Sequence, residues 1–302
     1  MKFRQCVLKI MIGIFACYTL NLSANDTTDC HQAMKRGDMV TAIKLADSAL
    51  KQAQNDFETL VCKGRAQSGL EEFDAAIVSF EIAKNATQDF FQQAVTMALI
   101  GGAQKNKNQL DAALTTYQQL LILSQKHHIK RYERIAHNRI GEIELKQNHL
   151  EAALSDFQSG DKLAANNNEH ADNYAQIATV YRAMGKYTQA IEYQMKAKLT
   201  QDQFGDLESQ ANAMLMLGQL YTEAKQYTQA QETLTKLLKF SQDNGGEYYE
   251  AMALIHIFAL KMQMNEQVEA LNQLDAAQKI NKKLQSEELR LEIDRLSKQV
   301  KS

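Results

Sequence analysis

The sequence predicts an all-α protein, a solenoid of about seven helix hairpins with a helix that caps its C-terminal end. Three observations lead to this fold class. Small residues recur at two landmark positions in each repeat, apolar residues near the landmarks have the spacing of a helix face, and glycine or asparagine recurs where the helices of a repeat should join. The chain has 302 residues, 45% of them hydrophobic and 23% charged, which is typical of a folded soluble protein.

The first landmark is an alanine that recurs at spacings of 34, 37, 40, 37, 40 and 40 residues. An aromatic residue or leucine follows three or four residues later in all copies but the first, and a small or aliphatic residue follows after seven. The seven alanines are Ala42, Ala76, Ala113, Ala153, Ala190, Ala230 and Ala270. This regularity over seven copies indicates an internal repeat.

The second landmark stands 12 residues before each alanine and is small in six of the seven repeats. Its members are Cys30, Gly64, Gly101, Gly141, Ala178, Gly218 and the less faithful Phe258. The nearby apolar residues Ile177, Val180, Tyr181 and Met184 form one helical stripe. Each repeat is therefore predicted to form two helices, and we expect the small residues to mark the place where the two backbones approach closely.

Turn residues recur five positions before the landmark alanine in five of the seven repeats: Gly37, Asn108, Asn148, Gly185 and Asn265. Glycine and asparagine tolerate the left-handed conformation that ends many helices. Asn55 with Glu58 and Asn148 with Glu151 have the spacing of capping boxes at helix starts. The stretch NNNEH at residues 166–170 is predicted to be a loop.

Two short motifs resemble the tetratricopeptide repeat family: LGQLY at Leu217–Tyr221 and AAIVSF at Ala75–Phe80. The resemblance extends over residues 25–302 and implies a right-handed superhelical solenoid, with a capping helix at about 285–302. The chain departs from the family pattern because it has no proline or tryptophan, and because most repeats exceed the usual length of about 34 residues. These repeats resemble the longer-helix members of the family.

The N-terminus has the layout of a secretory signal peptide at residues 1–24. Basic Lys2, Arg4 and Lys9 precede a short apolar stretch at Ile10–Leu22, and the small residue Ala24 marks the expected cleavage site. Lipid attachment at Cys17 is the alternative. We therefore expect a periplasmic or secreted protein without an integral membrane segment. Cleavage would leave 31 basic and 36 acidic residues, a formal net charge of −5, which gives no reason to expect nucleic acid as a partner.

Export changes the interpretation of the two cysteines that remain, Cys30 and Cys62. In an oxidising compartment they could form a disulfide across a separation of 32 residues. The alternative is a pair of buried free thiols. A catalytic pair of Cys30 with His31 is disfavoured because no orienting or oxyanion-binding group lies nearby in the sequence.

The first helix of each hairpin should line the concave surface of such a solenoid. Resemblance to the family implies that this surface binds extended peptides or partner helices. The side chains expected to point inward lie about one turn before or after the second landmark: Arg65, Lys105, Asn138, Glu142, Thr179, Arg182, Asn212, Gln219 and Thr222. A partner protein or peptide could form hydrogen bonds with this mixture of amides, hydroxyls and charges.

Two other segments are unusual. Residues 126–139 (KHHIKRYERIAHNR) contain five basic residues and three histidines, which suits either a surface for an anionic partner or a charged connection with Ile129, Tyr132 and Ile135 turned inward. Residues 250–264 (EAMALIHIFALKMQM) are apolar on nearly all sides, which favours a buried helix over a methionine-rich binding surface.

The sequence carries no phosphate-binding glycine loop, nucleophile elbow, HExxH or CxxC motif. No catalytic activity, cofactor or metal site is therefore predicted. The interpretation is an exported scaffold or adaptor that binds a protein or peptide, and its oligomeric state stays open. The alternative is a ligand- or peptide-sensing module that signals to a membrane partner.

Overall fold

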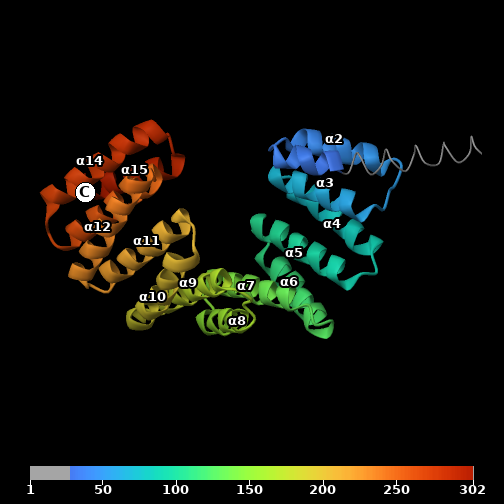
Figure 1. Cartoon of the computed structure of the whole chain (residues 1–302), viewed down its shortest axis with the longest axis horizontal. Coiled ribbons are helices and arrows are strands. Elements are labelled where there is room, and N and C mark those ends of the chain that lie inside the picture. The colour runs from blue at the N-terminus through green and yellow to red at the C-terminus, as the bar shows by residue number, and fades with distance from the viewer. Residues whose placement is uncertain (1–27, 302) are drawn as a thin grey trace, which may run out of the picture. The chain divides into compact units, whose positions relative to one another are not determined.

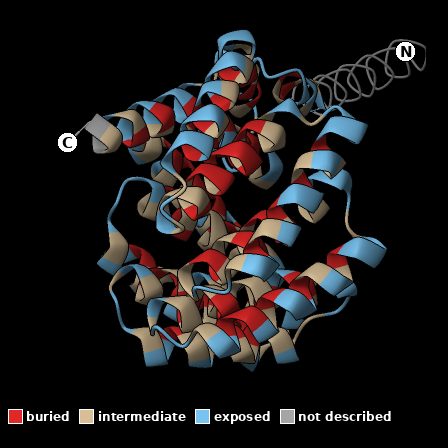
Figure 2. Ribbon diagram, turned by 90° about the vertical axis from the view of Figure 1, so that its left-hand side faces the viewer, coloured by how far each residue is buried: buried red, intermediate tan, exposed pale blue. Residues whose placement is uncertain are grey.

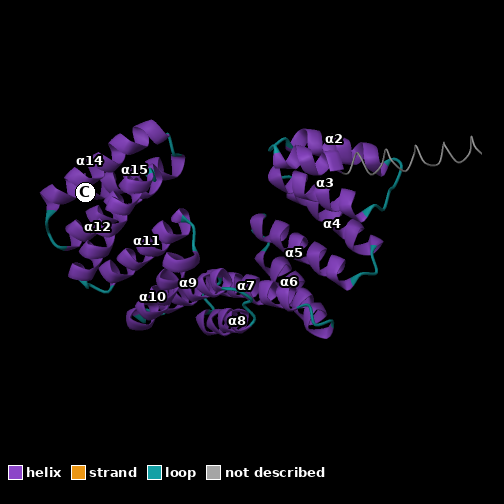
Figure 3. Ribbon diagram, viewed as in Figure 1, coloured by secondary structure: helices purple, strands orange, loops and turns teal. Residues whose placement is uncertain are grey.

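The computed structural model describes residues 28–301 of the chain, so the predicted signal peptide lies outside the described residues. All regular secondary structure in this described part is helical, with short loops between the helices (Figure 3). The described part of the chain divides into two compact units, one up to Ile143 and one from Glu144 onward. The predicted all-α class is confirmed.

The first unit begins its described part with helical residues 28–35 and continues through consecutive antiparallel helices (Figure 1). Helices α2 to α6 pack in chain order, α3 also contacts α5, and α6 and α7 contribute to one hydrophobic cluster. The helices of this unit are α2 (Met39–Leu50), α3 (Phe57–Gly69), α4 (Phe73–Ala86), α5 (Phe90–Asn106), α6 (Leu110–Lys126) and α7 (Lys130–Lys146), within which the boundary between the units falls.

In the second unit, successive helices again pack in chain order, while α11 also contacts α13 and α13 also contacts α15. Odd-numbered helices therefore stack on one another, as the first helices of successive hairpins do in a solenoid. The helices are α8 (Leu150–Lys162), α9 (Asn167–Ala183), α10 (Tyr187–Phe204), α11 (Leu207–Glu223), α12 (Tyr227–Asn244), α13 (Glu247–Gln263), α14 (Gln267–Leu284) and α15 (Glu287–Lys301).

The landmark alanines all lie in the core. Each of the seven has no exposed surface, and the buried positions of every helix face its neighbours (Figure 2). A side chain no larger than a methyl group lets the second helix of each hairpin pack closely against the helices beside it. The repeat seen in the sequence is thus the repeat of the core.

The glycines of the second landmark receive a side chain rather than a neighbouring backbone. A Cβ atom at Gly64 would lie 2.4 Å from Cε1 of Phe80, and one at Gly218 would lie 2.5 Å from Cδ2 of Leu234. At Gly101 the contact is 2.7 Å, with the ring of Tyr117. The expected close approach of backbones is therefore corrected: each of these three glycines makes room for a large side chain 16 residues later.

The turn prediction is confirmed at all five positions and extends to two more. Gly37, Asn108, Asn148, Gly185 and Asn265 have positive φ, and so do Glu71 and Lys225 at the equivalent positions of the other two repeats. At the turn that contains Lys225, the amide of Gln226 donates to the carbonyl of Tyr221 at 2.8 Å, and this hydrogen bond ends the preceding helix.

Three predictions at helix starts are wrong. Asn148 is the left-handed residue after α7, so it does not cap α8, and Asp56 rather than Asn55 caps α3 by accepting from the amide of Thr59 at 2.8 Å. Residues 166–170 are not a loop, because Asn166 caps α9 and the carboxylate of Glu169 accepts from the amide of Ala165 at 2.8 Å. These contacts resemble a capping box, with the carboxylate of Glu169 accepting from the residue before the cap rather than from the cap itself.

The two unusual segments have structural roles. Helix α13 is buried by α11, α12, α14 and α15, in agreement with the predicted core helix. Tyr132 is buried and Ile129 and Ile135 pack beside it, so the apolar residues of the basic segment turn inward as expected. The predicted capping helix corresponds to α15, which buries Leu289, Ile293 and Leu296 on one side.

A disulfide joins Cys30 to Cys62, and both side chains are fully buried beside Ala42, Ala46 and Ala66. It ties the helical segment at residues 28–35 to α3. The bond therefore links the first hairpin of the array covalently to the second.

Candidate partner-binding surface

The candidate inward residues fall on one side of the odd-numbered helices because of helical periodicity. Asn212 and Gln219 are seven residues apart, which is close to two turns, and Glu223 lies one further turn along the same side of α11. The opposite side of α11 is fixed by Gly218 against Leu234 of α12. The packing of α11 against α12 therefore determines that Asn212, Gln219 and Glu223 face away from α12.

In the first unit, Glu142 of α7 joins two helices. Its Oε2 accepts from Nζ of Lys105 on α5 at 2.7 Å, and its Oε1 accepts from Nη1 of Arg139 at 2.5 Å. Tyr117 packs near these two α7 side chains, and burial raises the pKa of its phenol to about 12. The predicted residues Lys105 and Glu142 thus meet in one ion-paired cluster.

In the second unit, Arg182 of α9 and Glu223 of α11 form a bidentate pair. Nε and Nη2 of Arg182 donate to the two carboxylate oxygens at 2.7 and 2.5 Å. Nε2 of Gln219 donates to the same carboxylate at 3.2 Å. Such a two-point contact holds both side chains in a fixed orientation across adjacent repeats.

His256 of α13 extends this polar row. Burial lowers the pKa of His256, while the charges of Glu292 and Glu223 raise it and that of Arg182 lowers it. The histidine therefore lies within electrostatic reach of charged side chains from α9, α11 and α15. The row of Arg182, Gln219, Glu223 and His256 crosses α9, α11 and α13, and Glu292 of α15 lies beyond its end.

The remaining candidates differ in accessibility. Arg65 and Asn212 are exposed, and Asn138 and Thr179 are partly exposed, although the hydroxyl of Thr179 donates to the carbonyl of Ala175 at 2.9 Å. Thr222 needs correction as an inward residue, because it is buried and its hydroxyl donates to the carbonyl of Gly218 at 2.9 Å. Its small side chain lets α11 pack closely.

Sequence reasoning missed Arg139, Glu223 and His256. Their positions carry no recurring residue type, so the repeat pattern gave no reason to single them out. A search for opposite charges about one repeat apart would have found Arg182 and Glu223, which are separated by 41 residues.

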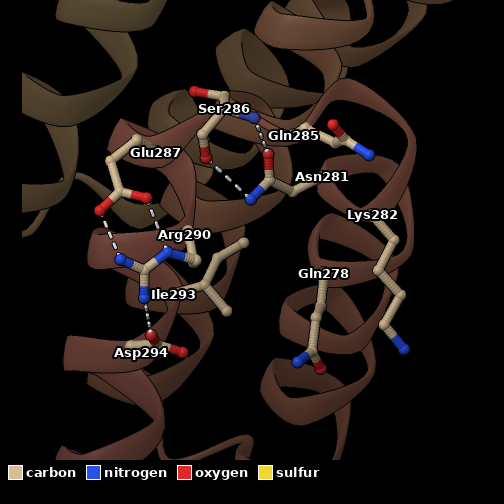
Figure 4. Close-up of a pocket in the computed structure, with 9 residues that line it drawn as sticks. All are labelled: Gln278, Asn281, Lys282, Gln285, Ser286, Glu287, Arg290, Ile293 and Asp294. Carbon is tan, nitrogen blue, oxygen red and sulfur yellow. Dashed lines mark hydrogen bonds and ion pairs between the residues drawn. The ribbon is translucent and has the colours of Figure 1, made fainter.

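A separate pocket of about 300 Å³ lies between α14 and α15 (Figure 4). The side chain of Asn281 exchanges two hydrogen bonds with the backbone of Ser286, at 3.0 and 3.1 Å, and so fixes the turn. Arg290 is paired with Glu287 and Asp294 across one wall. The charges of the pocket are thus balanced within it. We therefore regard the pocket as a junction between two helices rather than as a candidate binding site.

Within residues 28–301, no cluster of three or more histidine, cysteine, aspartate or glutamate side chains is arranged to hold a metal ion. No helix in this same part is both long and apolar enough to cross a membrane.

Residues 169–243 match the tetratricopeptide repeat family. Outer dynein arm-docking complex subunit 4 of Xenopus laevis is 23% identical over 215 residues, which cover 70% of this chain and 40% of that protein. The chain therefore matches less than half of the length of this curated relative.

Two solved structures share the fold over almost the whole chain. A tetratricopeptide repeat protein from Parabacteroides merdae ATCC 43184 has a TM-score of 0.63 at 14% identity and covers 90% of this chain and 99% of its own. Rap protein complexed with Competence and Sporulation Factor has a TM-score of 0.58 at 14% identity, covering 92% and 97%. With the helix pairs and buried landmarks described above, these matches show that the chain has the solenoid fold of tetratricopeptide repeat proteins.

Proposed function

We propose that the protein is an exported scaffold or adaptor that binds a partner protein or peptide on the side formed by its odd-numbered helices. The observation that carries this proposal is the polar row of Arg182, Gln219, Glu223 and His256 across α9, α11 and α13. A row that continues from repeat to repeat suits an extended ligand, because each repeat can contact a successive part of it.

The ion pairs contribute to such binding by fixing geometry. Arg182 and Glu223 have side chains only 31% and 25% exposed, so their positions are already restrained before a partner arrives. Less ordering entropy is then lost on binding. The exposed amide of Asn212 and the partly exposed amide of Gln219 supply both donors and acceptors for a polypeptide backbone.

Two features support an exported location. The sequence begins with the basic and apolar pattern of a signal peptide. The Cys30–Cys62 disulfide suits an oxidising compartment, because cytosolic thiols are kept reduced. We accordingly propose a periplasmic or secreted site of action.

The fold itself is compatible with holding another molecule. The Rap protein structure was solved as a complex with Competence and Sporulation Factor. This describes that protein, and for this chain it supports only the choice of a binding role over a purely structural one.

The test is to block the proposed surface and measure recovery of the partner. Thr179→Arg with Gln219→Arg adds bulk and charge to the proposed surface, and Lys162→Glu with Lys236→Glu serves as a control on exposed positions of α8 and α12. Affinity purification from the producing cells should recover a defined protein with wild type and the control, and at least tenfold less with the blocked variant. Equal recovery with the blocked variant would contradict the proposal. A small molecule that raises the melting temperature, without any protein partner, would favour the sensing alternative.

A further inference from the structure

We propose that the protein associates with itself head to tail, with a basic edge of one copy docking into an acidic pocket of the next. The basic edge comprises Phe90, Phe91, Lys126, Lys130 and Arg131 in the first unit. The acidic pocket is formed in the second unit where α11 and α13 begin and α12 ends. This contact is separate from the partner-binding surface proposed above.

The acidic pocket has a volume of about 350 Å³ and walls that are mainly apolar. Its walls include Leu207, Phe240, Tyr248 and Tyr249, and Glu208 is its one charged lining residue. Ser241 and Asn244 also line it, but their polar groups donate to the carbonyls of Leu237 and Phe240 in their own helix at 2.9 and 2.8 Å. The pocket therefore offers aromatic faces and a carboxylate to whatever enters it.

The surroundings of the pocket are acidic, although one of their carboxylates, Asp202, is paired with Lys198 at 2.5 Å. Residues 201–209 and 241–250 contain six acidic residues and no lysine, arginine or histidine. Burial raises the pKa of the Tyr249 phenol, and the nearby charges of Glu208 and Asp206 add to the shift, which places these carboxylates beside the ring. Leu207 in the wall is 52% exposed, and Phe204, three residues earlier in the chain, is 54% exposed. Aromatic rings beside carboxylates suit a cation carried on an apolar stem.

The basic edge supplies that chemistry on the same chain. Lys126, Lys130 and Arg131 are exposed at the turn between α6 and α7. Phe90 stacks on His127 with ring centroids 3.5 Å apart, and Phe91 meets Tyr132 edge to face at 5.4 Å. These contacts hold the two phenylalanines beside the basic turn while 46% and 48% of their surface stays exposed.

The two surfaces complement each other in charge and in apolar character. An arginine or lysine from the basic edge can place its charge next to Glu208 and its stem against the aromatic walls. Each copy carries one basic edge and one acidic pocket. Because these two surfaces differ, the contact between copies is heterologous. Its strength should fall as salt rises, since exposed charges contribute much of the attraction.

The experiment uses sedimentation velocity on the purified protein over a range of concentrations, at low and high salt. Wild type should associate at low salt, and its association constant should be at least tenfold smaller at high salt. Glu208→Lys and Arg131→Glu should each abolish association when studied alone. Glu151→Lys and Lys186→Glu are matched controls, because they reverse exposed charges at the start of α8 and α10 and should associate like wild type.

Mixing the two defective variants tests the geometry directly. Glu208→Lys keeps an intact basic edge and Arg131→Glu keeps an intact pocket, so an equimolar mixture should form a heterodimer that cannot grow further. Circular dichroism melting curves first verify that both variants are folded. Wild type that stays monomeric at low salt overturns the proposal, as does a mixture of the two variants that stays monomeric.

Discussion

The guanidinium of Arg182 and the carboxylate of Glu223 share two parallel hydrogen bonds of 2.7 and 2.5 Å, although the residues are 41 positions apart. They join the first helices of two successive repeats on the side turned away from the hairpins. This pair should stabilise the stacking of α9 on α11. A double-mutant cycle with Arg182→Gln and Glu223→Gln should give a coupling free energy of about 1 kcal/mol in urea unfolding.

The control for that cycle is the pair of Lys196 and Glu192, which lies within α10 and is 45% and 61% exposed. Solvent screening should reduce its coupling to about 0.5 kcal/mol or less. A coupling for Arg182 and Glu223 no larger than this control would show that the bidentate pair does not tie the repeats together.

Adjacent glycines in α5 should respond in opposite directions to alanine. A Cβ atom at Gly101 would lie 2.7 Å from the ring of Tyr117, so Gly101→Ala should cost about 1–3 kcal/mol through overpacking. At Gly102 the nearest atom within reach is the Tyr117 hydroxyl at 3.8 Å, so Gly102→Ala should stabilise by up to about 1 kcal/mol through helix propensity. Urea denaturation measures both, and equal effects would refute the packing explanation.

Glycine should be better than the native residue at two helix ends. Glu71 and Lys225 have φ of 61° and 60°, a conformation that strains a side chain with a Cβ atom. Glu71→Gly and Lys225→Gly should each raise the free energy of unfolding by about 0.5–1 kcal/mol. Gly185→Ala, at the same position of another repeat, should lower it by a similar amount. Destabilisation by both glycine variants would argue against strain.

Removal of the disulfide should weaken the N-terminal hairpin. The bond closes a separation of 32 residues, so Cys30→Ala with Cys62→Ala should lower the free energy of unfolding by about 3–4 kcal/mol. A reductant should lower the melting temperature of wild type and leave that of the double variant unchanged. A reductant effect of equal size on both proteins would show that another group is responsible.

Stability should fall in mild acid because of His256. Burial lowers the pKa of His256 from the usual 6.5, so below that value the unfolded state binds the proton more readily than the folded state does. Above pH 6.5 the histidine is neutral in both states and contributes no pH dependence. His256→Gln should therefore lose part of the decline in stability that wild type shows below pH 6.5. An unchanged profile in the variant would assign the decline to other groups.

The fold could be predicted because its determinants recur. The landmark alanines are fully buried in every repeat, and a repeated packing constraint leaves a repeated residue. The turns were predicted where glycine or asparagine occupies the left-handed position, and missed at Glu71 and Lys225 because the backbone there adopts the conformation at some cost. Local residue preference could not reveal a geometry that the packing of the hairpin imposes.

The arrangement of the candidate surface was only partly predictable. Helical periodicity predicted that Arg182 and Gln219 lie on one side of their helices, and both contact Glu223 there, but it could not tell which candidate positions are buried, as Thr222 is. Glu223 and His256 were missed because each acts through contacts with other repeats, and such pairings depend on how the helices stack. Asp56 was missed by one residue, since several polar residues precede α3 and the helix start selects one of them.

Position-specific photo-crosslinking tests the central claim most directly. A crosslinking residue placed at Thr179, Asn212 or Gln219 samples the side of the odd-numbered helices, and one at Lys162 or Lys236 samples exposed positions of α8 and α12. In the producing cells, the first set should form an adduct with one defined protein or peptide, and the second set should not. Adducts that arise only from Lys162 and Lys236 would contradict the assignment of the binding surface.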